Sequence, residues 1–180
     1  MPGIYTEAKK AQDDALVKSK SDILKAWKEL GEVTGRYYKP VETYRTEGAE
    51  TVFLTMGSIG ETVAIAVDEL RDQGKAAGLI KLRLWRPFPF EEFREAAMGV
   101  KQIIVIDRAI SYGGPGGPVA SEIRSVLYGE ENMPEVTNFL CGLAGRDVTP
   151  EDYIEMYERT ERMAGSTARQ EDYVFYGVRE

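Results

Sequence analysis

A glycine-rich segment is the first place where this sequence offers residues for chemistry. It runs from Asp107 to Pro118 (DRAISYGGPGGP) and places four glycines between an apolar run and an expected helix start. Glycine-rich strand-to-helix turns can bind phosphates, because free backbone N–H groups and a helix N-terminus both favour anions. The same composition also forms plain tight turns, so the segment by itself leaves both interpretations open.

The segment departs from the two common phosphate motifs. A Walker A loop needs a Lys and a Ser or Thr after its last glycine, and a Pro-Val pair stands there instead. Gly114 and Gly116 match the first two glycines of the dinucleotide fingerprint GxGxxG, and Ala120 stands one residue beyond its last position, which is Val119. However, Pro118 removes a backbone donor, and the segment follows the fourth expected strand instead of the first. We favour a turn or a packing loop, with an anion site near the N–H groups of Gly116 and Gly117 as the alternative.

Two other polar segments have a structural explanation beside a functional one. The RPFP segment that begins at Arg86 could present a guanidinium group, but prolines on both sides of an aromatic residue are typical of a stiff connector. The GRDVTP segment that begins at Gly145 could be a recognition turn. Pairing of Arg146 with Asp147 and an N-cap at Thr149 would explain it without a ligand.

The composition limits the chemistry that one copy of the chain can do. Its 180 residues contain no histidine and a single cysteine, Cys141. A Ser-His-Asp triad, a His-ligated zinc, an internal disulfide and a four-thiolate iron–sulfur cluster are therefore excluded. We expect Cys141 to be a small buried hydrophobic residue. Acidic pairs such as Glu130-Glu131 are typical of solvated faces, and they identify no acid–base catalyst.

Charge and hydropathy indicate the class of partner. The formal net charge is −7 and Lys and Arg do not cluster, which argues against nucleic acid or an anionic membrane as partner. No apolar run reaches the ~18 residues of a membrane span, and the polar start lacks the apolar region of a signal peptide. We expect a cytoplasmic protein. With 43% hydrophobic and 29% charged residues, its composition is that of one globular domain.

The first 34 residues predict a long amphipathic helix. Between Tyr5 and Thr34 the residues are helix formers without proline, and Leu16, Ile23 and Trp27 recur on one face. If the helix is interrupted, we expect the break at the serines of the KSKSD segment. At ~1.5 Å per residue it would run roughly 40 Å. Part of its apolar face is therefore expected to cover something outside the domain.

Strand and helix patterns alternate along the rest of the chain. We expect strands at 41–45, 51–56, 77–84, 102–106 and 136–140. We expect helices at 58–74, 90–98, 119–128 and 149–163. Ser58 with Glu61 predicts one capping box, and Thr149 with Asp152 predicts a similar cap at the last helix.

This alternation predicts a three-layer α/β/α fold with a mostly parallel sheet of about five strands. We divide the chain into a linker-like helix (1–34), an α/β domain (35–163) and a C-terminal tail (164–180). The tail ends in YVFYGV and is apolar enough to dock on something. In such sheets a ligand lies beyond the carboxyl ends of the strands where strand order reverses. Asp107 and the glycine loop lie at such an end.

Four motifs carry a resemblance to a known family. In order, they are GRYYKPVETYRTEGAETVFLTMGS, LRLWRPFP, IDRAISYGGPGGP and GLAGRDVTPEDY. Together they resemble the carboxyl-terminal part of the alpha subunit of pyruvate:ferredoxin oxidoreductase and related 2-oxoacid:ferredoxin oxidoreductases, over roughly Gly35 to Tyr157. The leading helix resembles the linker after that subunit's first domain. With Met1-Pro2-Gly3 before it, we expect a piece of a longer subunit or a naturally split subunit.

The resemblance implies a role within a large enzyme. Enzymes of this family oxidise a 2-oxoacid with thiamine diphosphate and magnesium, reduce ferredoxin or flavodoxin through iron–sulfur clusters, and form acyl-coenzyme A and carbon dioxide. The resembling region is a transketolase-carboxyl-terminal-like domain, with five strands of which one edge strand is antiparallel. It implies an assembly role with no catalytic residue and no cofactor or metal bound by this chain. Its partners would be the other domains and subunits.

Ten residues are the candidates for an inter-domain or subunit contact. They are Arg86, Asp107, Arg108, Ser111, Gly113, Gly114, Gly116, Gly117, Arg146 and Asp147. Two alternatives stay open. One is an independent flavodoxin-like module that binds a phosphate-bearing ligand, such as coenzyme A or a flavin, at the glycine loop. The other is a free-standing adaptor protein that binds through the long helix. Pyruvate as the substrate is an inference from overall likeness alone.

Overall fold

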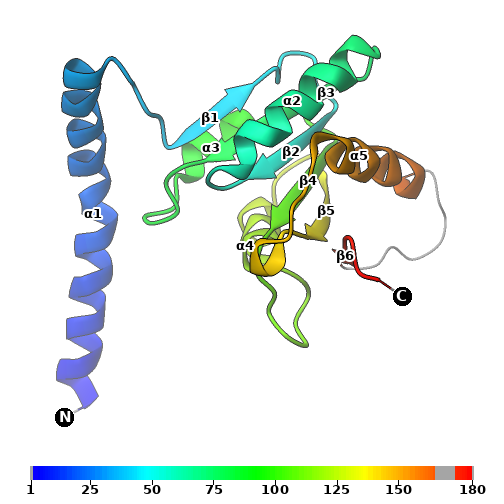
Figure 1. The fold of residues 1–180 in the computed structure, drawn as a ribbon. Coiled ribbons are helices and arrows are strands. Elements are labelled where there is room, and N and C mark those ends of the chain that lie inside the picture. The colour runs from blue at the N-terminus through cyan, green and yellow to red at the C-terminus, as the bar shows by residue number, and fades with distance from the viewer. Residues whose placement is uncertain (1, 165–172, 180) are drawn as a thin grey trace.

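Figure 1 shows the fold in a computed structural model, which describes residues 2–164 and 173–179. The strands are β1 (Val41–Tyr44), β2 (Thr51–Thr55), β3 (Ala77–Leu82), β4 (Gln102–Asp107), β5 (Glu135–Leu140) and β6 (Val174–Phe175). The helices are α1 (Pro2–Thr34), α2 (Ile59–Asp72), α3 (Phe90–Ala96), α4 (Pro118–Leu127) and α5 (Pro150–Ala164), with a 3-10 turn η1 (Leu143–Gly145).

The described strands form one sheet in the order β1-β3-β2-β4-β5-β6. β1 is antiparallel to β3, and the other neighbouring pairs are parallel. The mostly parallel sheet with one antiparallel edge strand is therefore confirmed. The number of strands differs from the expected five, because Val174 of the tail lies beside Phe139 of β5 and adds a short sixth strand.

Helices cover both faces of the sheet, which completes the three layers (Figure 1). One core cluster lies beneath α3 and α4 and includes Phe93 and Ile123. The other lies beneath α2 and α5 and includes Val67 and Tyr153. Every residue of β2, β3 and β4 is buried, as expected of central parallel strands with continuous apolar runs.

The α1 helix is continuous over 33 residues, so the break considered at its serines does not occur. The hydroxyls of Ser19 and Ser21 donate to carbonyls one turn earlier within the helix. Only Gly31 of α1 is buried, and in Figure 1 the N-terminal part of the helix extends beyond the α/β body, which the helix meets through an ion pair between Lys20 and Glu92 at 2.8 Å. Within the described residues, no helix combines the length and apolarity needed to cross a membrane.

The two expected helix caps have different outcomes. At α5, the N–H of Thr149 donates to an Asp152 carboxylate oxygen at 2.7 Å, and the N–H of Asp152 donates to the Thr149 hydroxyl at 3.4 Å. That cap is confirmed. At α2, the Ser58 side chain makes no capping hydrogen bond, so the predicted capping box is wrong. Glu61 instead accepts from the Lys81 ammonium at 2.8 Å, because β3 brings that buried lysine beneath the first turn of α2.

Candidate functional site

The carboxyl end of β4 carries Asp107, which is 2% exposed and fully engaged by the chain itself. Its two carboxylate oxygens accept from the N–H groups of Val119 and Ala120, each at 3.0 Å. The Asn138 amide of β5 also donates to Asp107, at 3.1 Å. Burial raises the pKa of Asp107, while these donors and the Arg124 charge act to lower it. Asp107 therefore caps α4 from inside the core.

The glycines of the loop allow the Asp107 carboxylate to approach the backbone at the start of α4. The N–H of Gly117 donates to the Asn138 side-chain oxygen at 2.8 Å. A Cβ atom at Gly117 would lie 2.2 Å from the Asp107 carboxyl carbon, and one at Gly116 would lie 2.6 Å from the Asn138 oxygen. Since Pro118 has no N–H, the first donors of α4 are occupied by Asn138 and Asp107. This network favours the packing interpretation of the loop over an anion site there.

The tip of the loop is a short projection, which we call the finger (residues 111–116). Ser111 and Gly116 form an antiparallel bridge, with the N–H of Ser111 donating to the Gly116 carbonyl at 3.1 Å. A guanidinium nitrogen of Arg124 donates to the Pro115 carbonyl at 3.0 Å and braces the finger from α4. Tyr112 at the tip is 92% exposed. In Figure 1 this loop extends away from the sheet beyond α4.

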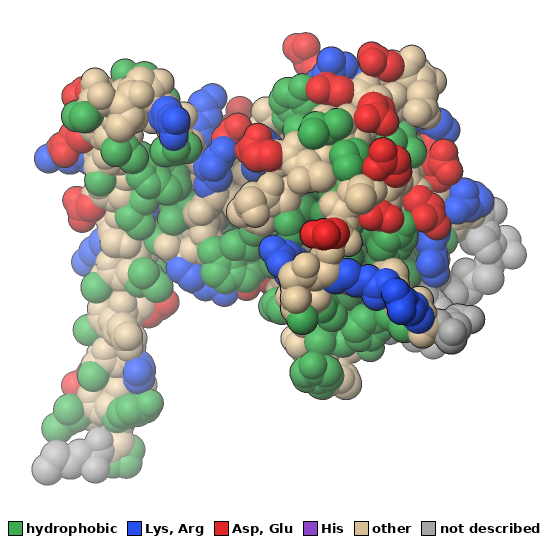
Figure 2. All heavy atoms as spheres, viewed as in Figure 1, with side chains coloured by type: hydrophobic (Ala, Val, Ile, Leu, Met, Phe, Trp, Pro, Cys, Tyr) green, Lys and Arg blue, Asp and Glu red, His purple; other side chains and the backbone are tan. Residues whose placement is uncertain are grey.

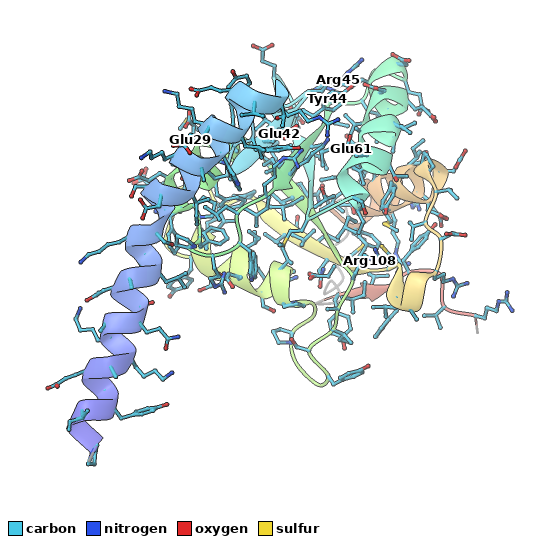
Figure 3. All side chains as sticks on the ribbon, turned by 60° about the vertical axis from the view of Figure 1, so that its left-hand side comes forward. Glu29, Glu42, Tyr44, Arg45, Glu61 and Arg108 are labelled. Atoms are coloured by element: carbon cyan, nitrogen blue, oxygen red, sulfur yellow. The ribbon has the colours of Figure 1, made fainter. Side chains whose placement is uncertain are left out.

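A separate pocket lies where strand order reverses, between β2 and β4, and we call it the switch-point pocket. Its volume is about 240 Å³. It is lined by Ser58, Ile59, Thr62, Arg108, Cys141, Gly142, Gly145, Arg146, Asp147, Val148 and Tyr153. Figure 3 shows Arg108 beside η1, apart from Glu42, Tyr44 and Arg45 at the β1 edge. The pocket thus joins the loop after β2 to the loops after β4 and β5.

Hydrogen bonds hold Arg108 at one wall of this pocket. Its Nε and Nη2 atoms donate to the Gly142 carbonyl at 3.2 and 3.1 Å. The expected pairing of Arg146 with Asp147 is wrong, because no ion pair joins them in the described structure. Arg146 instead packs near Gly177 of the C-terminal segment, where an added Cβ would lie 3.5 Å from its Nε.

Arg86 lies elsewhere, in the connector between β3 and α3. Its guanidinium stacks on Trp85, with its carbon 4.6 Å from the ring centroid, and its Nη2 lies 2.7 Å from a carboxylate oxygen of Glu122. The ten candidate residues therefore fall in four places: the buried Asp107 network, the finger, the switch-point pocket and this connector. Reasoning from sequence missed Asn138, a fully buried polar residue whose place within an apolar strand was the available signal.

The cysteine and the carboxylates do not make a metal site in the described residues. No group of three or more His, Cys, Asp or Glu side chains there is placed to hold a metal ion. Cys141 is buried, and burial raises the pKa of its thiol from 9.0 to about 11. A protonated, enclosed thiol is a poor ligand and a poor nucleophile.

These features define an α/β domain whose buried polar residues hold loops in place, with a finger and a pocket at the carboxyl edge of its sheet. The chain belongs to the pyruvate:ferredoxin oxidoreductase core domain II family, which matches residues 49–153 of the 180.

Two curated relatives illustrate the range of this likeness. The chain is 41% identical over 160 residues to pyruvate synthase subunit PorA of Methanothermobacter thermautotrophicus, covering 89% of the chain and 40% of the relative. It is 36% identical over 179 residues to ketoisovalerate oxidoreductase subunit VorA of Pyrococcus horikoshii, covering 99% of the chain and 45% of the relative. The chain thus spans less than half the length of these curated relatives.

Two solved structures share the fold. A 2-oxoglutarate:ferredoxin oxidoreductase from Magnetococcus marinus aligns with a TM-score of 0.54 and 22% identity, over 68% of this chain and 20% of that one. A split-gene transketolase aligns with a TM-score of 0.51 and 16% identity, over 69% of this chain and 42% of that one. The expected transketolase-like fold is confirmed.

Proposed function

We propose that this chain is a non-catalytic packing part of the alpha subunit of a 2-oxoacid:ferredoxin oxidoreductase. The finger carries the proposal, because it presents Tyr112 at 92% exposure on a braced, hydrogen-bonded loop. Exposed aromatic residues on rigid supports are typical contact anchors, since little side-chain entropy is lost when they are buried. Ser111, Gly113 and Gly114 of the finger would lie in this contact.

The whole enzyme would oxidise a 2-oxoacid and coenzyme A to acyl-coenzyme A and carbon dioxide, with ferredoxin or flavodoxin as acceptor. Pyruvate is the first substrate to test, because the relative described above from Methanothermobacter thermautotrophicus is a pyruvate synthase subunit. Ketoisovalerate is the second, since a relative with that substrate in its name matches over 99% of the chain.

The residues of this chain do not fit the iron–sulfur clusters or the magnesium ion of such an enzyme. An iron–sulfur cluster needs several thiolates, and Cys141 is a single thiol whose burial raises its pKa to about 11. Magnesium is held by several oxygen ligands, and the described carboxylates form no such group. Thiamine diphosphate, when bound, would stabilise the carbanion that loss of carbon dioxide leaves on the substrate. We place these groups on the other domains and subunits, and the residues here would act by assembly.

Reconstitution with matched tyrosine variants tests the proposal. The 180-residue chain is combined with the rest of the alpha subunit and the other subunits of the enzyme from its source organism, and assembly is followed by light scattering after size exclusion. Tyr112→Ala should weaken assembly by about tenfold or more, the loss typical of an aromatic anchor. Tyr128→Ala is the control, because Tyr128 is 86% exposed and lies after α4, away from the finger. Equal assembly of the two variants would contradict the assigned contact.

Activity gives a second and independent readout. Pyruvate-dependent reduction of ferredoxin in the presence of coenzyme A is measured for the chain alone and for the reconstituted complex. We expect turnover from the complex only, and turnover by the chain alone would overturn the packing role.

A further inference from the structure

The switch-point pocket gathers cationic and hydrogen-bond donor groups that the packing role leaves unused. Two arginines reach it from different loops: Arg108 follows β4, and Arg146 follows η1. Both side chains are exposed, and neither has a carboxylate partner within the described residues. Guanidinium groups that line one pocket without a carboxylate partner favour an anion in that pocket.

Arg108 is positioned in a way that leaves donors available. Its Nε and Nη2 groups are fixed on the Gly142 carbonyl, so the guanidinium plane is oriented while Nη1 is not used by the contact. A preorganised guanidinium loses less entropy when it binds an anion, and its planar fork matches a phosphate or carboxylate group. The arrangement therefore suits recognition of an oxyanion better than a freely rotating side chain would.

The opposite wall adds donors from the start of α2. Gly57 has a positive φ of 72°, and Ser58 follows in a right-handed conformation with φ −65° and ψ −22°. When a residue in the left-handed conformation is followed by one in the right-handed conformation, their successive N–H groups converge on one point and favour an anion. Ser58 and Thr62 both line the pocket and bring a hydroxyl to this wall, and within the described part of the chain the Ser58 side chain makes no capping hydrogen bond. Glu61 points to Lys81 instead of into the pocket.

The nearby acidic groups and the pocket volume limit the charge and the size of the ligand. Asp147 is the single carboxylate that lines the pocket, and Asp152 is engaged by the Thr149 N–H and the Tyr176 hydroxyl. A volume of about 240 Å³ lies below the ~300–1,000 Å³ of pockets for drug-sized molecules. Figure 2 shows Lys and Arg side chains crossing the face of the body near η1, whereas acidic side chains gather over α5.

From these observations we propose that the switch-point pocket binds a phosphate-type anion, held by Arg108, Arg146 and the backbone and hydroxyl donors at the start of α2. The ligand is inorganic phosphate or the phosphate or diphosphate group of a larger molecule. The proposal does not depend on the packing role, because the pocket is formed by this chain alone.

Calorimetry on the full 180-residue chain tests the site with inorganic phosphate and inorganic pyrophosphate, at constant ionic strength set by chloride. We expect saturable binding with one site per chain. Tighter binding of pyrophosphate than of phosphate would indicate a diphosphate-bearing ligand, and equal binding would indicate that a single phosphate fills the pocket. Absence of saturable binding of both probes would overturn the proposal.

Matched variants assign the binding to the pocket. Arg146→Gln and Arg108→Gln should each weaken binding by about tenfold or more, the loss typical of a charge-assisted hydrogen bond. Arg94→Gln makes the same charge change on α3, where Arg94 pairs with Glu130, and should change binding by less than about twofold. Thr62→Val keeps the shape of the side chain and should also weaken binding. If all four variants bind phosphate equally, the anion is held elsewhere by general charge and the proposal fails.

The folding of each variant is checked by circular dichroism, because Arg108→Gln also removes the contact with the Gly142 carbonyl. If that variant does not fold, Arg146→Gln and Thr62→Val still decide the outcome. Equal assembly of the Tyr112 and Tyr128 variants would contradict the packing contact and leave these titrations unchanged, so the two proposals can fail separately.

Discussion

Gly117 is the residue at which the explanation of the glycine loop can be tested most directly. Its backbone has φ −76° and ψ 158°, which any L residue can adopt, so Gly117→Ala introduces no backbone strain. The added methyl group would lie 2.2 Å from the carboxyl carbon and Oδ2 of Asp107 and 2.4 Å from its Cβ. Because Asp107 is enclosed by β4 and α4, it can avoid the methyl group only by moving away from its donors.

The expected loss of stability follows from those contacts. Overpacking a core position costs about 1–3 kcal/mol, and a hydrogen bond to a charged group contributes about 1.5–3 kcal/mol. Loss of the Val119 or Ala120 bond together with the clash gives about 3–5 kcal/mol, a large part of the ~5–15 kcal/mol typical of a domain. The free energy of unfolding is measured in urea by circular dichroism, with an unchanged m-value required.

Gly114→Ala is the control from the same loop. Its added Cβ would meet the Ser111 carbonyl oxygen at 3.1 Å, on the exposed finger, so a cost below about 1 kcal/mol is expected. If Gly117→Ala costs no more than this control, Asp107 can rearrange freely. The claim that glycine is required by the approach of the carboxylate would then be wrong.

Three further predictions concern other parts of the chain. With a thiol pKa of about 11, Cys141 at pH ~8 has a thiolate fraction of about 0.1%. Iodoacetamide should therefore label it at least about 100-fold more slowly than a thiol of pKa 9.0. Comparable labelling rates in the native protein would contradict the burial of Cys141. The Lys81 ammonium lowers the pKa of Glu61 below 4.5, so this pair stabilises the fold above that pH and stops doing so as pH falls through the lowered value. Glu61→Gln should therefore cost below about 1 kcal/mol in urea unfolding at neutral pH and nothing at pH ~2, and a difference that grows in acid would refute the assignment. Removal of residues 1–34 should cost about 2 kcal/mol or less, because Gly31 alone of the α1 residues is buried and the contacts of the helix with the body include a single ring pair, Trp27–Tyr38, and a partly exposed ion pair, Lys20–Glu92. Failure of residues 35–180 to fold would show that α1 belongs to the domain.

The sheet could be predicted closely because its central strands have a strong local signal. The expected strand at 51–56 is observed as Thr51–Thr55, and the one at 102–106 as Gln102–Asp107. Both are continuous apolar runs, which a strand covered on two faces requires. β6 has two residues, and a two-residue strand has no periodicity to detect. It forms because Val174 is buried beside β5 and the Tyr176 hydroxyl, which has one proton to donate, lies 2.6 Å from a Glu155 carboxylate oxygen and 3.0 Å from an Asp152 carboxylate oxygen.

The candidate site could be predicted only in part, because its grouping depends on strand register. The sequence placed Asp107 and the glycines at the carboxyl edge, where they lie. The sequence could not show that the neighbouring side chains of Asp107 and Arg108 go to different places. Asp107 enters the buried network with Asn138, and Arg108 lines the switch-point pocket. That separation follows from the pairing of Val105 with Asn138 and of Asp107 with Leu140, which sets the Asn138 amide beside the carboxylate.

The glycine loop shows why a helix start preceded by glycines does not by itself identify a ligand site. The N-terminus of α4 favours an anion on physical grounds, and a phosphate or a carboxylate satisfies that preference equally well. Here the anion is Asp107, supplied from the end of β4 and bonded to the N–H groups of Val119 and Ala120. At α2 the Ser58 side chain makes no capping hydrogen bond, the N–H groups of Gly60 and Glu61 donate to the Gly57 and Ser58 carbonyls, and no carboxylate of the described residues is bound there. Two arginines without carboxylate partners in the described structure line the pocket beside this helix start. The helix start with fewer glycines is therefore the one where an external anion is expected.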